Sequence, residues 1–517
     1  MQDIRLDLQA HCPGEESSGQ GLLCVQVLTF ATGCVLTPPP RKMASPWTFI
    51  FVCGLLAATL VQATLSPPAV LSLGPEVIKE KLTQELKNHN AVSILQQLPL
   101  LSAMREEPAG GIPFLGNVVN TIMNHITWLK VTSANVLQLQ VQPSGDGQEL
   151  MIKIPLDMVA GLNTPLVKSI VEIHMEAEAQ AIIQLESSEE GHNRLILTNC
   201  LTSQGGLHIS LLRKLTFLAN FLTDKVMGFL VPALPKMVKS ELCPVIKAAF
   251  EDMYADLLRL VRVPVSLTFN HLEFDLLSLA INSSVIQLNL RAKLSDSQGK
   301  VTNWFNDSLV SLTVPTLDSA PFSLIVRQDV VNSVVAALLS PEELAVLLDY
   351  VLPKLAHQLK SSIKPISEKA ADQLGPTQIV KIFTQDTPVL LLSKGNANVA
   401  QRIVFEVFAT NEARCPLFTL GIEASSEAQF YTEGDRLMLN LNNIRSDRIY
   451  LMNSGIGLFN ADFLEDIITE ILDSILLPNE NGKLRPGILI SIVKALGFEE
   501  VACSLTDDAL VLTPVYS

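Results

Sequence analysis

The sequence predicts an α+β protein made of two similar halves, each with a long antiparallel sheet packed against amphipathic helices. Three observations predict this class. Apolar residues recur at helical spacing in each half, long stretches alternate apolar and polar residues with period two, and the same succession occurs twice. A mature chain of about 450 residues also exceeds one ordinary hydrophobic core, so two domains are expected.

Residues 43–63, MASPWTFIFVCGLLAATLVQA, have the pattern of a secretory signal peptide. An apolar core at 47–61 ends in the small-residue site Val61-Gln62-Ala63, which predicts cleavage between Ala63 and Thr64. Because a signal normally leads the chain, translation from Met43 is the simplest interpretation. Residues 1–42 are then an artefact of the gene model or an alternative leader.

A second apolar core at 22–36 is a competing signal, although acidic residues and only Arg5 precede it. Either signal predicts a secreted, extracellular protein. No later stretch reaches roughly 18 uninterrupted apolar residues, so the mature chain is expected not to span a membrane.

The balance of apolar and charged residues is unusual. The chain is 48% hydrophobic and 17% charged, whereas soluble chains average about 25% charged residues. Such a balance suits a long aliphatic core or an aliphatic cavity that holds a hydrocarbon. Residues 64–262 carry 16 Lys and Arg against 19 Asp and Glu, and residues 263–517 carry 18 against 29. This negative field excludes nucleic acid as a partner.

Each half is predicted to begin with a short amphipathic helix. In the first half, Gly74-Pro75 precedes an apolar stripe of Ile78, Leu82 and Leu86. In the second half, Ser340-Pro341-Glu342-Glu343 has the pattern of a capping box. The apolar face of that helix would be Leu344, Leu347, Leu348 and Val351.

Each half also contains a longer helix with an apolar face. The first is predicted at about 215–245, with a kink or break at Pro232 and Pro235. The second is predicted at 460–477 and ends at Pro478. Its apolar stripe would be Phe463, Ile467, Ile471 and Ile475.

Period-two alternation predicts the strands. It covers residues 136–142 and 171–181 in the first half, and 437–441 after the turn Glu433-Gly434-Asp435 in the second. Residues 263–294 also alternate. Because this segment is poor in Gly and Pro, we expect a β connection there rather than a flexible linker. Sheets and helices of this kind either enclose an elongated apolar pocket or pack closely without one, and periodicity does not separate these outcomes.

No residue pattern indicates an active site. The eight histidines form no HxH or HExxH motif and the chain has no CxxC, so a local zinc signature is absent. The G-x-S-x-G elbow of lipase-type hydrolases is also absent. Ser361-Ser362-Ile363-Lys364 matches S-x-x-K without the motifs that accompany it. The sequence therefore predicts no catalytic residues, no metal and no cofactor, and a secreted hydrolase is the least favoured class.

Four cysteines remain in the mature chain: Cys200, Cys243, Cys415 and Cys503. An even number in an oxidising compartment favours disulfides, and spacing leaves all three pairings open. The sequons that begin at Asn282 and Asn306 predict two N-linked glycans.

Several of these residues carry a resemblance to a known family. Cys200 and Cys243 bracket the strand predicted at 207–212 and the first long helix, and residues 454–459 lead into the second. Together with Gly110-Gly111-Ile112-Pro113 and residues 129–141, they resemble the BPI/LBP/PLUNC lipid-binding family, and its PLUNC branch in particular.

The resemblance implies a boomerang of two BPI-like barrels joined by a central β-sheet, each barrel with an apolar pocket for an acyl chain. The N-terminal barrel would be 64–262, the central connection 263–320 and the C-terminal barrel 321–517. It also implies one disulfide, Cys200–Cys243, which would join a strand end to the last part of a helix that ends around Pro244. Cys415 and Cys503 would pair with each other or stay free.

We therefore expect apolar pockets between helix and sheet, with ordinary core packing as the alternative. The candidate lining residues are Leu82, Leu86, Leu222, Val226 and Phe229 in the first half and Ile467, Ile471 and Ile475 in the second.

The implied function is a secreted protein of mucosal innate immunity, as in the airway, that binds lipopolysaccharide or phospholipid and modulates host responses. Because residues 64–262 are net acidic, attraction to bacterial surfaces and direct killing are disfavoured. The alternative is a surface-active or protein-interaction component of mucosal fluid without a stoichiometric lipid.

Overall fold

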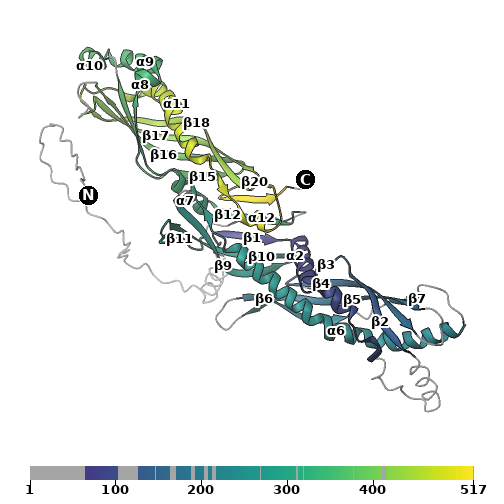
Figure 1. Ribbon diagram of the computed structural model, residues 1–517. Coiled ribbons are helices and arrows are strands. Elements are labelled where there is room, and N and C mark those ends of the chain that lie inside the picture. Colours follow the sequence, from purple (N-terminus) through teal and green to yellow (C-terminus); the bar gives the residue numbers. More distant parts are fainter. Residues whose placement is uncertain are drawn as a thin grey trace, which may run out of the picture.

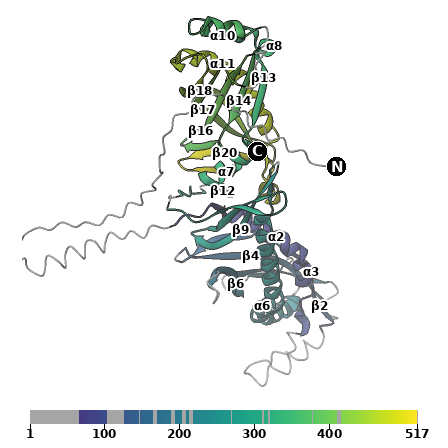
Figure 2. The ribbon, with the colours of Figure 1, turned by 90° about the vertical axis from the view of Figure 1, so that its left-hand side faces the viewer.

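The computed structural model describes residues 65–102, 126–145, 147–163, 170–187, 193–202, 208–211, 217–267, 269–309, 312–317, 320–375, 378–409 and 415–515. The predicted leader, the signal peptide, the cleavage site at Ala63 and Thr64, and residues 110–113 lie outside this part. The molecule is elongated, and its two halves lie end to end (Figures 1 and 2).

Within the described residues, three antiparallel sheets follow one another along the molecule. The N-terminal sheet has the order β2-β4-β5-β6, with β3 paired to β4 and β7 to β5. Its strands are β2 (Trp128–Val136), β3 (Gln140–Ser144), β4 (Glu149–Asn163), β5 (Val171–Ser187), β6 (Asn193–Thr202) and β7 (His208–Leu211). The predicted strand at 171–181 is confirmed: Val171, Ile173 and Met175 are buried, and the residues between them are partly or fully exposed.

The central sheet joins the two halves, in the order β20-β21-β12-β1-β10-β9-β8, with β11 on β10. The segment predicted as a β connection supplies β8 (Val265–Ser266), β9 (Asn270–Asn282), β10 (Val285–Asp296) and β11 (Val301–Phe305). The other strands come from distant parts of the chain: β1 (Ala69–Leu73), β12 (Phe322–Arg327), β20 (Val501–Thr506) and β21 (Ala509–Pro514). Both ends of the described chain therefore meet in the middle of the molecule.

The C-terminal sheet has the order β13-β14-β16-β17-β18-β19, with β15 on β16. Its strands are β13 (Glu343–Leu347), β14 (Ile379–Thr384), β15 (Val389–Ser393), β16 (Asn396–Phe408), β17 (Phe418–Glu433), β18 (Arg436–Ser454) and β19 (Ile488–Leu489). Strands β17 and β18 form a long hairpin across the turn predicted at Gly434.

The helices lie against these sheets (Figure 1). Those of the N-terminal half are α2 (Pro75–Asn88), α3 (Ala91–Gln96) and α6 (Phe217–Val261). Those that follow are α7 (Gln328–Leu338), α8 (Leu348–Val351), α9 (Pro353–Ile363), α10 (Glu368–Gln373), the 3₁₀ turn η2 (Ala461–Leu464), α11 (Glu465–Leu484) and α12 (Ser491–Ala495). Helix α2 confirms the first predicted helix, since Ile78, Leu82 and Leu86 are buried on one face.

Three helix predictions were wrong. Helix α6 runs unbroken through Pro232 and Pro235 to Val261, and α11 continues past Pro478 to Leu484. Pro232 and Pro478 are exposed, and buried residues on the opposite face hold each helix against its sheet. This packing outweighs the backbone hydrogen bonds that the prolines remove.

The third error concerns residues 343–347, which form strand β13 instead of a helix. Pairing with β14 explains this outcome, because residues Glu343 to Leu347 meet Phe383 to Ile379 in register. Helix follows only at α8 and, beyond Pro353, at α9. The predicted strand at 136–142 is likewise divided, since β2 ends at Val136 and β3 begins at Gln140.

Candidate functional site

The interior of the N-terminal half lies between helices α2 and α6 and the inner face of the sheet. Helix α6 buries every fourth side chain along most of its length. These residues are Val226, Leu230, Leu234, Val238, Leu242, Ile246 and Phe250, all at most 1% exposed. Four residues turn an α-helix about 40° beyond one full turn, so this row winds around the helix.

The strands opposite this row are aliphatic and partly lined with small residues. On β4 the inward side chains include Ile152, Ile154 and Leu156. They lie opposite Ala181, Ala179 and Ala177 of β5. All six are at most 3% exposed. Because alanine fills little space, the inner face of β5 is less bulky here than that of β4.

The structure places most of the predicted N-terminal lining residues in this interior. Leu82, Leu86 and Val226 are fully buried in the same apolar cluster, and Phe229 is partly buried against it. The side chain of Leu222 lies outside the described part of the chain. The predicted residues thus share one helix–sheet interface, and their role in lining a lipid cavity stays a prediction.

The C-terminal half repeats the arrangement with a shift of one residue from the predicted stripe. The buried row is Leu464, Ile468, Leu472, Leu476, Glu480 and Leu484, each at most 2% exposed. Of the predicted residues, Ile471 is buried, Ile467 and Ile475 are partly buried, and Phe463 is 44% exposed. The predicted stripe therefore lies beside the face that contacts the sheet. Ile467 and Ile475 still pack against the C-terminal core, and the role of the three isoleucines in lining a lipid cavity stays a prediction.

Glu480 is the one acidic residue in that buried row. Its Oε2 accepts a hydrogen bond from Gln401 Nε2 on β16, at 3.2 Å. Burial raises the pKa of Glu480 to about 7; the Gln401 bond opposes this rise and the nearby Glu342 carboxylate adds to it. Glu342 is itself held by Lys483 Nζ at 2.7 Å and Asn479 Nδ2 at 2.6 Å. Sequence periodicity missed this group because a single Glu in an apolar helix normally faces solvent.

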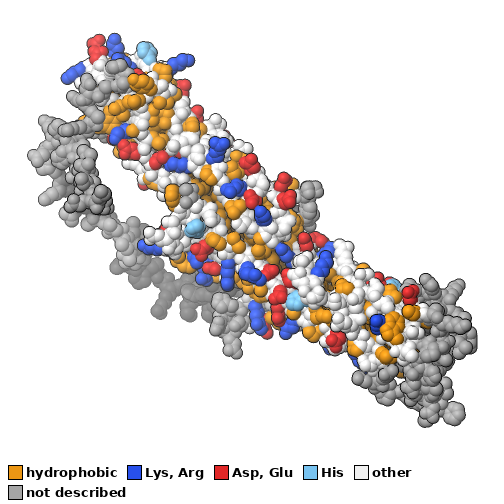
Figure 3. Space-filling view, viewed as in Figure 1, with side chains coloured by type: hydrophobic (Ala, Val, Ile, Leu, Met, Phe, Trp, Pro, Cys, Tyr) orange, Lys and Arg blue, Asp and Glu red, His pale blue; other side chains and the backbone are white. Residues whose placement is uncertain are grey.

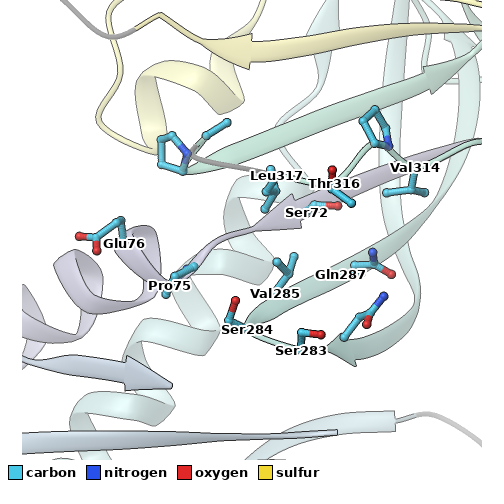
Figure 4. Close-up of a pocket in the computed structure, with 14 residues that line it drawn as sticks. Ser72, Pro75, Glu76, Ser283, Ser284, Val285, Gln287, Val314, Thr316 and Leu317 are labelled. Carbon is cyan, nitrogen blue, oxygen red and sulfur yellow. The ribbon is translucent and has the colours of Figure 1, made fainter. Parts of the chain in front are cut away.

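A cavity of about 450 Å³ lies where α2 meets the central sheet. Figure 4 shows Ser72 on β1 and Val285 at the start of β10 on two sides, with Pro75 and Glu76 at one end. None of the predicted lining residues borders it. Ser72 is 1% exposed, and its Oγ has no hydrogen-bond partner among the described residues. The sequence could not reveal this cavity, because three distant segments form it: 72–76, 282–287, and 314–317 with 320–321.

Cys200 and Cys243 form a disulfide, with their Cα atoms 5.9 Å apart. The bond joins β6 to the middle of α6, not to its last part as expected, because the helix continues for 18 residues beyond Cys243. Close by, the hydroxyl of Thr202 donates to the carbonyl oxygen of Pro235 at 3.1 Å. Cys503 is a free thiol, so it is not bonded to Cys415.

The two predicted glycosylation sites are exposed. Asn282 ends β9 at the rim of the cavity, and Asn306 follows β11. Both positions could accept a glycan without disturbing the core, and their modification stays a prediction.

Comparisons with known proteins place the chain in a family. The profile of the LBP / BPI / CETP family N-terminal domain matches residues 85–253, and that of its C-terminal domain matches residues 283–513. The chain belongs to the LBP / BPI / CETP family. The predicted family is therefore confirmed, and with it a lipid-binding fold.

Relatives within this family match nearly the whole chain. Human BPI fold-containing family B member 1 is 69% identical over 472 residues, which cover 91% of this chain and 98% of that protein. The mouse protein of the same name is 56% identical over 475 residues, covering 92% of this chain and all of the relative. A crystal structure of lipopolysaccharide binding protein matches 87% of this chain and 99% of its own, with a TM-score of 0.51 at 13% identity. This match supports the two-barrel fold of the family.

Within the described residues, no helix combines the length and the apolar character needed to cross a bilayer.

Proposed function

We propose that this protein is a secreted, non-enzymatic lipid-binding protein of mucosal surfaces. Its ligands would be the acyl chains of lipopolysaccharide or phospholipid, and its role would be to modulate host responses by sequestering them. Family membership supports lipid binding in general. The observation that carries the proposal for this chain is the aliphatic interior between α2, α6 and the alanine-lined part of β5.

The charge of the N-terminal half favours recognition of acyl chains over recognition of phosphates. Residues 64–262 are net acidic, so long-range attraction to anionic lipid A or bacterial membranes should be weak. Binding driven by apolar burial changes little with added salt, whereas binding driven by phosphate contacts weakens steeply. We therefore expect lipid binding that is insensitive to salt.

Lipid extraction and native mass spectrometry of protein purified from eukaryotic cells test the proposal. We expect co-purified phospholipid, or uptake of lipopolysaccharide on incubation. If neither lipid is recovered before or after incubation, the proposal fails.

Two substitutions at one position separate a lipid cavity from a closely packed core. Leu86 is 2% exposed on α2. If lipid occupies this interface, Leu86→Trp should displace lipid with little loss of stability, and Leu86→Ala should retain it. In a closely packed core, Leu86→Trp should cost about 1–3 kcal/mol and Leu86→Ala about 2–5 kcal/mol, with no change in lipid content. Thermal unfolding and lipid extraction of both variants give the answer.

A second candidate function, a surface-active component of mucosal fluid, is favoured by large exposed apolar side chains. Tyr350 is 75% exposed and Leu458 is 95% exposed. Figure 3 shows hydrophobic side chains gathered near the end that carries α8 and α9. This function predicts lower surface tension by lipid-free protein, and replacing Tyr350 and Leu458 with Ser should reduce that effect without altering bound lipid.

A further inference from the structure

Glu85, His89 and Asp252 meet where the C-terminal end of α2 lies against α6. One ligand atom from each side chain lies within 4.8 Å of the other two. His89 Nε2 is 2.8 Å from Asp252 Oδ2. Glu85 and His89 are four residues apart, so their side chains share one face of the helix end. The three groups therefore converge from two segments that are far apart in sequence.

The electrostatics of this cluster favour a cation. Two carboxylates flank one imidazole, and the carbonyl end of α2 adds a partial negative charge. The basic side chains nearby on α6 are paired with other acids: Lys247 with Glu251 at 4.0 Å, and Arg259 with Asp256. Asp252 in turn is paired with His89. A metal ion would thus meet a concentrated negative charge that these two cations do not neutralise.

The neighbouring residues also orient the ligands. Asn88 Nδ2 donates to Glu85 Oε2 at 3.1 Å, which leaves Oε1 of the same carboxylate available. The backbone N–H of His89 donates to the carbonyl oxygen of Glu85 at 2.9 Å, which holds the backbone of His89 at the end of the helix. A hydrogen bond to a ligating carboxylate, like that from Asn88 to Glu85, helps to hold a metal ligand in position.

We propose that Glu85, His89 and Asp252 bind one Zn²⁺ ion that joins α2 to α6. Three nitrogen and oxygen ligands with a fourth position left for water are a common zinc arrangement, and imidazole favours zinc over magnesium and calcium. Calcium would need six to eight oxygen ligands. No sequence pattern indicates this site, because Glu85 and its C-capping neighbour His89 lie at the end of α2 and Asp252 comes from the distant helix α6.

The ion replaces the hydrogen bond between His89 and Asp252. His89 must carry its remaining proton on Nδ1, so that the lone pair of Nε2 faces the metal. In a tetrahedral site with bonds of about 2.0 Å, neighbouring ligand atoms lie about 3.3 Å apart, so the pair at 2.8 Å would open slightly. Leu86 follows Glu85 on α2, so the ion would fix the end of the helix that carries the candidate lining residues.

Zinc titration of the full chain, expressed in eukaryotic cells and stripped with chelator, tests the site. Calorimetry should show one Zn²⁺ per chain, and zinc should raise the melting temperature. His89→Gln should abolish both effects, and Asp252→Asn should weaken zinc binding at least about tenfold. The Asp252 side chain is 62% exposed, so this second variant tests the site without a core change. Ca²⁺ should have no effect.

His174→Gln is the matched control. His174 Nε2 also faces an aspartate, Asp157 at 2.6 Å, but its second carboxylate, Glu176, approaches the other ring nitrogen at 3.9 Å. These two carboxylates cannot share one ion with a single nitrogen, so His174→Gln should leave zinc binding unchanged. Cobalt(II) gives a second readout, since a protein-bound ion should show visible absorption bands that His89→Gln removes. If wild-type protein takes up no zinc, or if His89→Gln and Asp252→Asn bind it as wild type does, the proposal is overturned.

Discussion

The two halves of the molecule hold a long helix against a twisted sheet by different means. In the N-terminal half, the Cys200–Cys243 disulfide ties α6 to β6. In the C-terminal half, the side-chain amide of Asn481 ties α11 to β18. Asn481 Oδ1 accepts from the backbone N–H of Leu441 at 2.8 Å, and its Nδ2 donates to the carbonyl oxygen of Leu441 at 2.9 Å.

The buried rows differ in polarity as well. In α6 every described member of the row is apolar, whereas α11 places Glu480 in the same kind of position. A disulfide keeps its geometry when the interior opens. Hydrogen bonds can break and reform, and a carboxyl group changes its charge with pH. The comparison therefore predicts a mechanically fixed N-terminal interior and a C-terminal interior that responds to pH.

Removal of the disulfide should have the largest effect. A cross-link across a separation of 43 residues contributes about 4 kcal/mol by the chain-entropy estimate. We expect Cys243→Ser to lower the free energy of unfolding by up to about that amount, as measured by denaturant unfolding. The thiol of Cys200, which is partly buried and loses its partner, should also form intermolecular disulfides on non-reducing gels.

The double variant Cys200→Ser with Cys243→Ser is the control for that experiment. It should be as unstable as the single variant but remain monomeric, because no thiol is left at either position. If Cys243→Ser is as stable as wild type, the disulfide is not what fixes α6, and the contrast between the halves is lost.

Glu480 should make the stability of the C-terminal half depend on pH. Its pKa rises from 4.5 to about 7 on folding, so the folded state binds more protons than the unfolded state between these values. The free energy of unfolding should therefore fall as pH rises from 4.5 to about 7, by about 3 kcal/mol in total, and stay low above that. Protonated Glu480 can also donate a hydrogen bond, and Gln401 Oε1 is buried with no partner among the described residues.

Glu480→Gln should remove this dependence, because an amide cannot ionise and can supply the same donor to Gln401. We expect the variant to be more stable than wild type at about pH 8 and similar to it near pH 4.5. Glu470→Gln, an exposed change on the same helix, should follow the wild-type curve. An unchanged pH profile for Glu480→Gln would show that Glu480 ionises normally.

The sequence predicted the fold better than the site, for physical reasons. Alternation in β5 and β10 revealed strands directly, because each has one buried face. The buried face of α11 was harder, since several neighbouring rows of this helix are apolar and the sequence does not say which of them contacts the sheet. Proline led to a predicted break at Pro232 and Pro235 and a predicted end at Pro478, whereas tertiary packing carries both helices through these positions. The cavity beside Ser72 depends on three distant segments, so no local pattern could predict it.

The smallest expected effect tests the amide of Asn481. Asn481→Ala removes two hydrogen bonds. The backbone N–H and C=O of Leu441 then lose these partners, and Leu441 is only 1% exposed. Two neutral bonds contribute about 2 kcal/mol, and the better helix propensity of alanine returns about 0.5 kcal/mol, so we expect a net loss of about 1–2 kcal/mol. Ser474→Ala, an exposed change on α11, reports the propensity gain alone. Hydrogen exchange should become faster in α11 and β18 and stay unchanged in α6. Faster exchange in α6 as well would mean that the halves unfold together, and that the two ways of holding a helix do not act independently.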